Sequence, residues 1–246
     1  MLQMSPLWAW GPVGHKLTGD LAQPLLTVKA QHAVKNLLGN ETLAEATLYL
    51  DKMRSDKRLF WQKTASPWHY VTLPKGQTYS PDKAPRKGDA YTALEKYSQQ
   101  LKSRYATTQE KKLALYFIIH IIGDLHQPLH VGNGKDRGGN DTTVYFSGKK
   151  TNLHRLWDSQ LINSEGKKYQ TWRQELTDDL SAQPIALWQA ANVFDWIAES
   201  AAIRDTIYPK EKVITPKYKQ ANLPIIKTRI QQAAVRMAAY LNTTFE

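Results

Sequence analysis

One segment constrains the fold more than any other. Residues 113–125, LALYFIIHIIGDL, are apolar on nearly every face of a helix, yet they include a histidine and an aspartate. A helix that is apolar all round is buried, so this segment predicts the central helix of a mainly α-helical core. It follows the capping-box pattern of Thr107 and Glu110, which marks the start of a helix.

Helical periodicity covers most of the remaining chain. Residues 60–89 are rich in Pro, Lys and Gly and predict an ordered loop, while the glycines and β-prone DTTVYF of residues 130–150 predict a short hairpin, the one strand region we expect. We therefore predict a single mainly α-helical domain with long loops. Further helices are expected from Pro12, at 28–38, 43–53 and 90–105, from Asn152, and at 172–180, 184–204 and 224–241.

Composition narrows the chemistry. The chain has no cysteine, which excludes thiolate nucleophiles, disulfides and iron–sulfur clusters, so any metal must be held by nitrogen and oxygen ligands. A formal net charge of +11 over 246 residues favours polyanionic partners such as nucleic acid. No apolar run is long enough to span a bilayer, and residues 1–9, MLQMSPLWA, resemble the tail of a secretory signal peptide. These features predict a secreted or periplasmic protein without a membrane span.

The histidines carry the strongest functional signal. His120 and Asp124 lie four residues apart on one face of the central helix, and His154 and Asp158 repeat that spacing on a second predicted helix. A single such pair is explained equally well by a buried histidine that is hydrogen-bonded to a carboxylate. Two pairs favour divalent metal binding, since cations offset the cost of burying acids. Further candidate ligands are His15, Asp51, His69 and His130.

A family resemblance rests on motifs that follow one another along the chain. It is carried by WGPVGH at 10–15, Asp51 with Arg54, WHY at 68–70, HIIGDLHQPLH at 120–130, GGN at 138–140 and NLHRLWD at 152–158. In this order they resemble the type I zinc-dependent nucleases, which comprise fungal single-strand nucleases, plant bifunctional nucleases and bacterial relatives. Zinc phospholipase C is a distant cousin with the same fold.

This resemblance implies three Zn²⁺ ions. Asp124 would bridge the first and third ions, and Trp10 would have to be the mature amino terminus, because only an unacylated, neutral α-amino group binds zinc. Residues 10–246 would then form the nuclease domain. The implied ligands are Asp51, His69, His120 and Asp124 for the first ion, His130, His154 and Asp158 for the second, and Trp10, His15 and Asp124 for the third.

The resemblance also implies roles in catalysis and substrate binding. Asp51 and Arg54 would be catalytic, and the alternative for Arg54 is a solvated basic face. Tyr70, Thr72 and Asn140 would bind substrate, but Tyr70 could be a core tyrosine and Asn140 an ordinary turn residue. Several relatives have an acidic residue where Thr72 stands, which leaves the base preference open.

The implied function is a zinc-dependent endonuclease. It would hydrolyse single-stranded DNA and RNA to 5′-phosphate products, with 3′-nucleotidase activity as a possible addition, and would act as a monomer without a stable protein partner. Two alternatives stay open at this point: a zinc phospholipase C that uses the same ligands on a lipid phosphodiester, and a zinc-stabilised nucleic-acid-binding protein without turnover.

Overall fold

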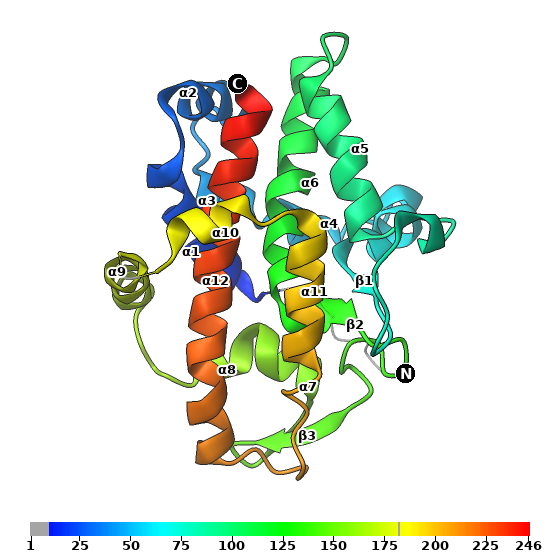
Figure 1. Ribbon diagram of the computed structural model, residues 1–246, viewed down its shortest axis with the longest axis vertical. Coiled ribbons are helices and arrows are strands. Elements are labelled where there is room, and N and C mark those ends of the chain that lie inside the picture. Colours follow the sequence, from blue (N-terminus) through cyan, green and yellow to red (C-terminus); the bar gives the residue numbers. More distant parts are fainter. Residues whose placement is uncertain (1–9, 182) are drawn as a thin grey trace.

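The long helices determine the architecture. The computed structural model describes residues 10–181 and 183–246, and it confirms a mainly α-helical single domain (Figure 1). The central helix α6 (Thr108–His126) packs against most of the other long helices and is buried from Ala114 to its end. Its partners are α1 (Pro12–Ala22), α2 (Val28–Leu38), α4 (Tyr49–Met53), α5 (Ala90–Lys102), α11 (Val193–Arg204) and α12 (Pro216–Phe245).

Short elements connect these helices. Most contain three to six residues, and several are single 3₁₀ or π turns. The exception is α9 (Tyr169–Leu180), a helix of 12 residues that packs against α1 and α12. The others are η1 (Gln23–Leu25), α3 (Leu43–Ala46), η2 (Phe60–Thr64), η3 (Ser66–His69), η4 (Pro81–Lys83), η5 (Pro128–His130), α7 (Leu153–Arg155), η6 (Leu156–Gln160), α8 (Leu161–Asn163) and α10 (Ile185–Ala190).

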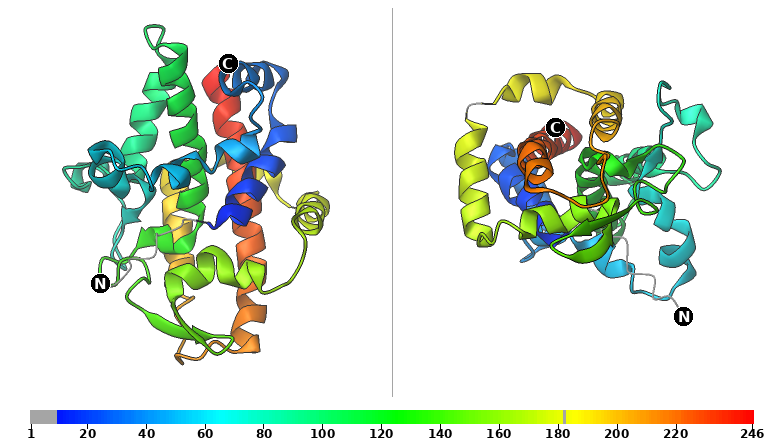
Figure 2. Two further views of the ribbon diagram at one scale, coloured as in Figure 1. Left: turned by 180° about the vertical axis from the view of Figure 1, so that it is seen from behind. Right: turned by 90° about the horizontal axis from the view of Figure 1, so that it is seen from below.

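Four short strands form two separate pairs. Strands β3 (Thr143–Phe146) and β4 (Lys149–Asn152) make the predicted antiparallel hairpin, which lies at the end of the molecule where α12 begins (Figure 2). Its turn places two residues, Ser147 and Gly148, at positive φ, as tight hairpin turns require.

The second pair corrects the expectation of a single strand region. Strand β1 (Val71–Thr72) pairs in parallel with β2 (Val131–Gly132), so part of the predicted 60–89 loop is joined to the segment that follows α6. Two-residue strands carry no readable period, which is why this pairing could not be predicted from the sequence.

Helix boundaries differ from the expected ones by a few residues at α5 and α9, and by more in the three segments that follow. The segment 184–204 is broken into α10 and α11, because Asn192 caps α11 with its side chain. The segment 43–53 is divided into α3 and α4. Helix α12 begins at Pro216 after the Thr215 cap rather than at Pro224, and Pro224 is accommodated inside the helix. Proline is favoured in the first turn of a helix, so the sequence is compatible with a helix start at either proline. In the structure the helix starts at Pro216.

No helix among residues 10–181 and 183–246 is long and apolar enough to cross a membrane. The predicted signal-peptide remnant, residues 1–9, lies outside the described part of the chain.

Candidate metal centre

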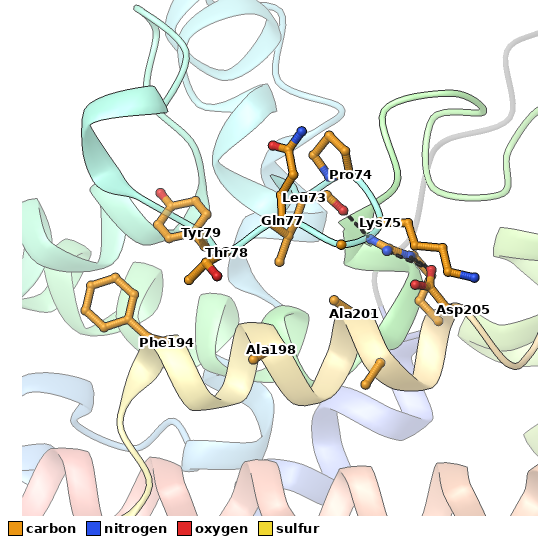
Figure 3. A pocket seen from close by; sticks show the side chains of 13 residues that line it. Leu73, Pro74, Lys75, Gln77, Thr78, Tyr79, Phe194, Ala198, Ala201 and Asp205 are labelled. Carbon is orange, nitrogen blue, oxygen red and sulfur yellow. Dashed lines mark hydrogen bonds and ion pairs between the residues drawn. The ribbon is translucent and has the colours of Figure 1, made fainter.

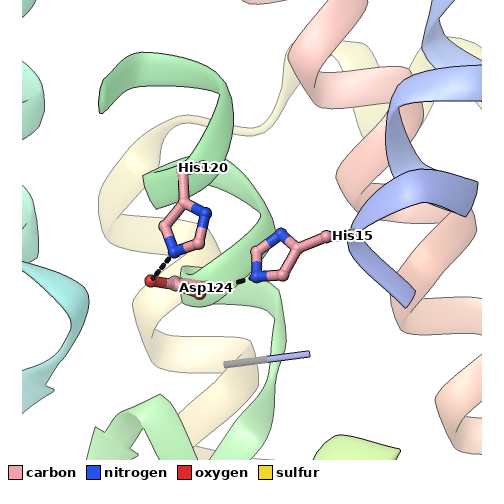
Figure 4. Close-up of side chains that lie close together, drawn as sticks. All are labelled: His15, His120 and Asp124. Atoms are coloured by element: carbon pink, nitrogen blue, oxygen red, sulfur yellow. Dashed lines mark ion pairs between the residues drawn. The ribbon is translucent and has the colours of Figure 1, made fainter. Parts of the chain in front are cut away.

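Buried histidines and aspartates converge at the end of α6. Within each of three groups, one ligand atom per residue lies within 4.8 Å of the others, and every member is buried. The groups are His15 with His120 and Asp124 (Figure 4), Asp51 with His69 and His120, and His130 with His154 and Asp158. The first two of them share His120.

Asp124 lies at the junction of these groups and is fully buried. Its Oδ2 is 3.0 Å from His69 Nδ1 and 3.2 Å from His120 Nε2, whereas its Oδ1 is 3.3 Å from His15 Nε2. The two oxygens therefore face different histidines. A carboxylate with this arrangement can bridge two cations, one on each oxygen.

Close packing of α1 on α6 brings His15 into the centre. The His15 ring stacks on that of His120 with centroids 4.2 Å apart. Gly123 makes this approach possible, because a Cβ there would lie only 2.9 Å from His15 Nδ1. The His15 imidazole therefore explains why a glycine occupies position 123.

The β1–β2 pair brings two further histidines together. His69 ends η3 just before β1, and His130 ends η5 just before β2, so the parallel pairing aligns them. His130 Nδ1 donates to the His69 carbonyl oxygen at 2.6 Å. The unpredicted strand pair is therefore the element that joins the WHY and QPLH motifs.

Backbone carbonyls orient three of the imidazoles. His120 Nδ1 donates to the Thr47 carbonyl at 2.6 Å, and His154 Nδ1 donates to that of Gly138 at 2.7 Å, in the same manner as His130. A neutral imidazole that donates through Nδ1 keeps its lone pair on Nε2. This is how metal-binding histidines are usually held by their surroundings.

His154 and Asp158 are brought together by irregular backbone. The expected α-helix from Asn152 contains a π turn, η6, between α7 and α8, and His154 Nε2 is 3.3 Å from Asp158 Oδ2. Such π turns within helices are frequent at functional sites. Gly138 allows the nearby loop to pass closely, since its φ is +63° and a Cβ would lie 2.3 Å from the Leu129 carbonyl oxygen.

Burial keeps most of these imidazoles neutral. It lowers the pKa of His69 to about 3, helped by the Arg54 cation, and it lowers the pKa of His154 to about 3, helped by His130. For His120 burial acts in the same direction, yet the carboxylates of Asp124 and Asp51 outweigh it and leave its pKa raised. Neutral imidazoles are the form that binds metal.

The donor atoms fit divalent cations such as zinc. Both oxygens of Asp51, Oδ1 of Asp124, both nitrogens of His15 and Nε2 of His130 are buried without a hydrogen-bond partner among the described residues. Unpaired buried polar atoms are rare in folded proteins, and this many at one point require a compensating charge. Nitrogen and oxygen ligands in groups of three are typical of zinc sites that keep a position open.

The other expected site residues lie around this centre. Arg54 Nε is 3.2 Å from Asp51 Oδ1, and its side chain is 22% exposed, so the guanidinium borders both the centre and solvent. Tyr70 is 45% exposed, and Thr72 is also exposed; being two residues apart in extended backbone, they share one face. Asn140 is half-buried and donates to the Arg137 carbonyl in its own turn.

Trp10, the first described residue, is fully buried. The next residue, Gly11, donates its backbone N–H to the Asp158 carbonyl at 2.6 Å, which ties the start of this segment to the second ligand pair. The structure thus places residue 10 beside the centre.

His126 lies outside the three groups and contacts Arg236. Sequence reasoning did not assign roles to the Thr47 carbonyl or to Gln127, whose amide donates to Asp158. No spacing rule could have identified a backbone carbonyl, but Gln127 lies within the HQPLH motif.

A separate cavity of about 240 Å³ lies between residues 73–79 and α11 (Figure 3). Its lining contains none of the ligands in the three groups. Arg204 at its edge donates to the carbonyl oxygens of Leu73 and Val131, which fixes the end of the β1–β2 pair. This cavity is therefore next to the supporting strands and is distinct from the metal centre.

The helical fold and this centre define a class of protein: hydrolases that gather divalent cations in a buried site of histidines and aspartates. The family model described as S1/P1 Nuclease matches residues 10–246. Endonuclease 2 of Arabidopsis thaliana is 31% identical over 96% of this chain and 90% of its own length. Nuclease S1 of Aspergillus oryzae is 24% identical over 91% of its length. Nuclease P1 of Penicillium citrinum is 23% identical over 97% of its length. The chain belongs to the S1/P1 nuclease family.

Proposed function

We propose that this protein is a zinc-dependent endonuclease that hydrolyses single-stranded DNA and RNA to 5′-phosphate products. Family membership supports the nuclease activity, and one observation supports the chemistry. The buried Asp124 carboxylate has its two oxygens directed at different histidines, which is the geometry of a bridging ligand. Activity on 3′-mononucleotides is part of the proposal.

The donor groups support three zinc ions. Asp124 would bridge two of them, and the α-amino group and carbonyl oxygen of Trp10 would complete the site of His15. The proposed ligand sets would be Asp51, His69, His120 and Asp124; His130, His154 and Asp158; and Trp10, His15 and Asp124. Bound zinc would supply Lewis acidity, which lowers the pKa of water and stabilises the negative charge of a phosphodiester transition state.

Two side chains of the protein would act directly on the reaction. Asp51 has both oxygens free of hydrogen bonds, so one can bind metal while the other orients the attacking water and accepts its proton. Arg54 would hydrogen-bond the non-bridging oxygens of the phosphate, where charge increases in the transition state. Its partial exposure allows contact with substrate, and its proximity to Asp51 fixes its position.

Tyr70 and Thr72 would contact the nucleotide next to the cleaved bond. An exposed tyrosine ring can stack on any base, and such contacts tolerate sequence variation. Asn140 would contribute from the loop that supports His154. The net charge of +11 would attract the polyanionic substrate over a longer range.

The requirement for a free Trp10 amino group supports a processed, exported protein. The mature chain would begin at Trp10 after removal of residues 1–9, in the periplasm or outside the cell, and would act as a monomer. Intact-mass measurement of the active protein tests this directly: full activity in a chain that keeps residues 1–9 would contradict it.

The function is tested with oligonucleotides of single-stranded DNA and RNA. We expect cleavage with 5′-phosphate ends, loss of cleavage after chelation, and recovery with zinc. His120→Gln should abolish cleavage, and His32→Gln, at an exposed histidine outside the three groups, should leave it unchanged. Zinc-loaded protein that leaves both substrates intact would contradict the proposal. Hydrolysis of phosphatidylcholine vesicles in the same assay would then indicate a phospholipase, and binding without cleavage a nucleic-acid-binding protein.

A further inference from the structure

Gln127 is a fully buried amide at the point where the ligand-bearing segments meet. It directly follows α6 and caps η5, the 3₁₀ turn that ends in His130. Its side chain makes two hydrogen bonds: Oε1 accepts from Leu129 N at 2.6 Å, and Nε2 donates to Asp158 Oδ1 at 2.5 Å. One side chain thus contacts two of the segments that form the group of His130, His154 and Asp158.

The orientation of this amide is determined by its partners. The Leu129 backbone N–H can only donate, so the amide oxygen must face it and the NH₂ group must face Asp158. In the reverse orientation, the amide NH₂ would face the Leu129 N–H, and the amide oxygen would face Asp158 Oδ1. Donor would then meet donor at one contact, and acceptor would meet acceptor at the other. Asp158 Oδ1 is therefore held by a neutral donor, and Oδ2 remains directed at His154 Nε2, 3.3 Å away.

The backbone that carries Gln127 is fixed from the opposite side. Arg229 of α12 donates to the His126 carbonyl at 3.1 Å, and Arg236 contacts His126 Nε2 at 3.0 Å. Both guanidinium groups also bind Glu199 at 2.6 Å. The end of α6 is consequently anchored to two neighbouring helices, and Gln127 can transmit that position to Asp158.

We infer that Gln127 is a positioning residue, which aligns Asp158 with His130 and His154 so that this group holds its own metal ion. The inference rests on the proposed zinc function. Gln127 has no close contact with the His15, His69 or His120 side chains among the described interactions, so its effect should be confined to one of the three groups.

The decisive variant is Gln127→Glu. Glutamate keeps the oxygen that accepts from Leu129 N, so the start of η5 is preserved, but it replaces the donor to Asp158 with an acceptor. Gln231→Glu is the matched control, because Gln231 is 2% exposed and donates Nε2 to the Leu176 carbonyl at 2.9 Å between α12 and α9. Both changes bury a carboxylate against an acceptor, and only one of them faces the metal centre.

Zinc per chain is measured by elemental analysis and by competition with a chelator, together with the melting temperature of the metal-free proteins. Wild type and Gln231→Glu should hold three zinc ions, while Gln127→Glu should hold one of them about 10- to 100-fold more weakly, the range found for groups that orient ligands. If Gln127→Glu fails to fold, Gln127→Met, which also lacks the donor but carries no charge, should show the same selective loss.

Two results would overturn this inference without affecting the proposed function. One is wild-type zinc affinity in Gln127→Glu or Gln127→Met. The other is an equal weakening of all three ions, which would indicate a general structural effect. A fall in the melting temperature of both metal-free glutamate variants, with zinc lost only from Gln127→Glu, supports it. Wild-type protein that binds no zinc would instead overturn the proposed function, and this inference with it.

Discussion

The two halves of the metal centre are built in different ways. His15, His120 and Asp124 project from the regular helices α1 and α6, whose packing sets the distances between them. His130, His154 and Asp158 lie on a 3₁₀ turn, one turn of α-helix and a π turn. We call these sets the helical half and the irregular half. In the helical half, helix packing sets the distances and the Thr47 carbonyl orients His120. The irregular half depends instead on a carbonyl of Gly138, a glycine conformation and the Gln127 amide.

The largest effect should follow from Asp124→Asn in the helical half. The amide lacks the negative charge that two of the proposed ligand sets share, so both cations facing Asp124 should be lost. We expect activity to fall by at least 10³-fold, beyond the 10- to 100-fold typical of groups that only orient ligands. The rate on a single-stranded oligonucleotide and zinc per chain measure this. Retention of all the wild-type zinc would contradict the bridging role.

A smaller effect is expected from His154→Gln in the irregular half. Only one group contains His154, so one zinc ion should be lost while the other two stay bound. The rate should fall by about 10²- to 10³-fold, comparable to removal of one stabilising group from a transition state. Parallel zinc analysis of His154→Gln and Asp124→Asn tests whether the halves are independent; identical stoichiometry in the two variants would break the distinction.

Arg54→Ala should lower kcat by about 10²-fold with little change in bound zinc, because Arg54 contacts Asp51 and is not a member of any group. Arg54→Lys should recover part of this loss, since it keeps the charge but cannot make two parallel hydrogen bonds. Initial rates over a range of oligonucleotide concentrations separate kcat from KM. An unchanged kcat in Arg54→Ala would assign the residue to the solvated surface.

The pH dependence of the metal-free protein should involve His154 of the irregular half and also His69, which belongs to the group of Asp51 and His120. Burial holds the pKa of His69 and of His154 near 3, below the 6.5 of an unfolded histidine. The unfolded chain therefore binds more protons between these values, and stability is lost as the pH falls below about 6.5. Each histidine should contribute about 1.4 kcal/mol per pH unit to that loss. Urea unfolding of chelated wild type, His69→Gln and His154→Gln from pH 7 to 5 measures it, and identical slopes in all three would contradict the account.

The difference between the halves also explains what the sequence could predict. The long periodic segments α2 and α6 were located closely, α6 with its Thr107 capping box, because regular helices are encoded by local periodicity and caps. The four-residue spacing of His120 and Asp124 translated directly into the 3.2 Å approach of their side chains. Here local sequence and final geometry are linked by a single helix.

The same spacing in His154 and Asp158 was less informative. The residues meet, but through a π turn that depends on packing and on partners distant in the chain. The parallel β1–β2 pair, which aligns His69 with His130, joins segments about 60 residues apart and is too short to leave a pattern. Long-range contacts of this kind determine the irregular half, so the spacing indicated its residues but not the backbone geometry that brings them together.

The most direct test of the three-ion centre is anomalous diffraction at the zinc absorption edge from crystals of the processed protein grown with zinc. The account predicts three peaks: two on either side of the Asp124 carboxylate, toward His15 and toward His69 with His120, and one between His130, His154 and Asp158. Absence of a peak beside Asp124, or strong peaks only outside these groups, would contradict it.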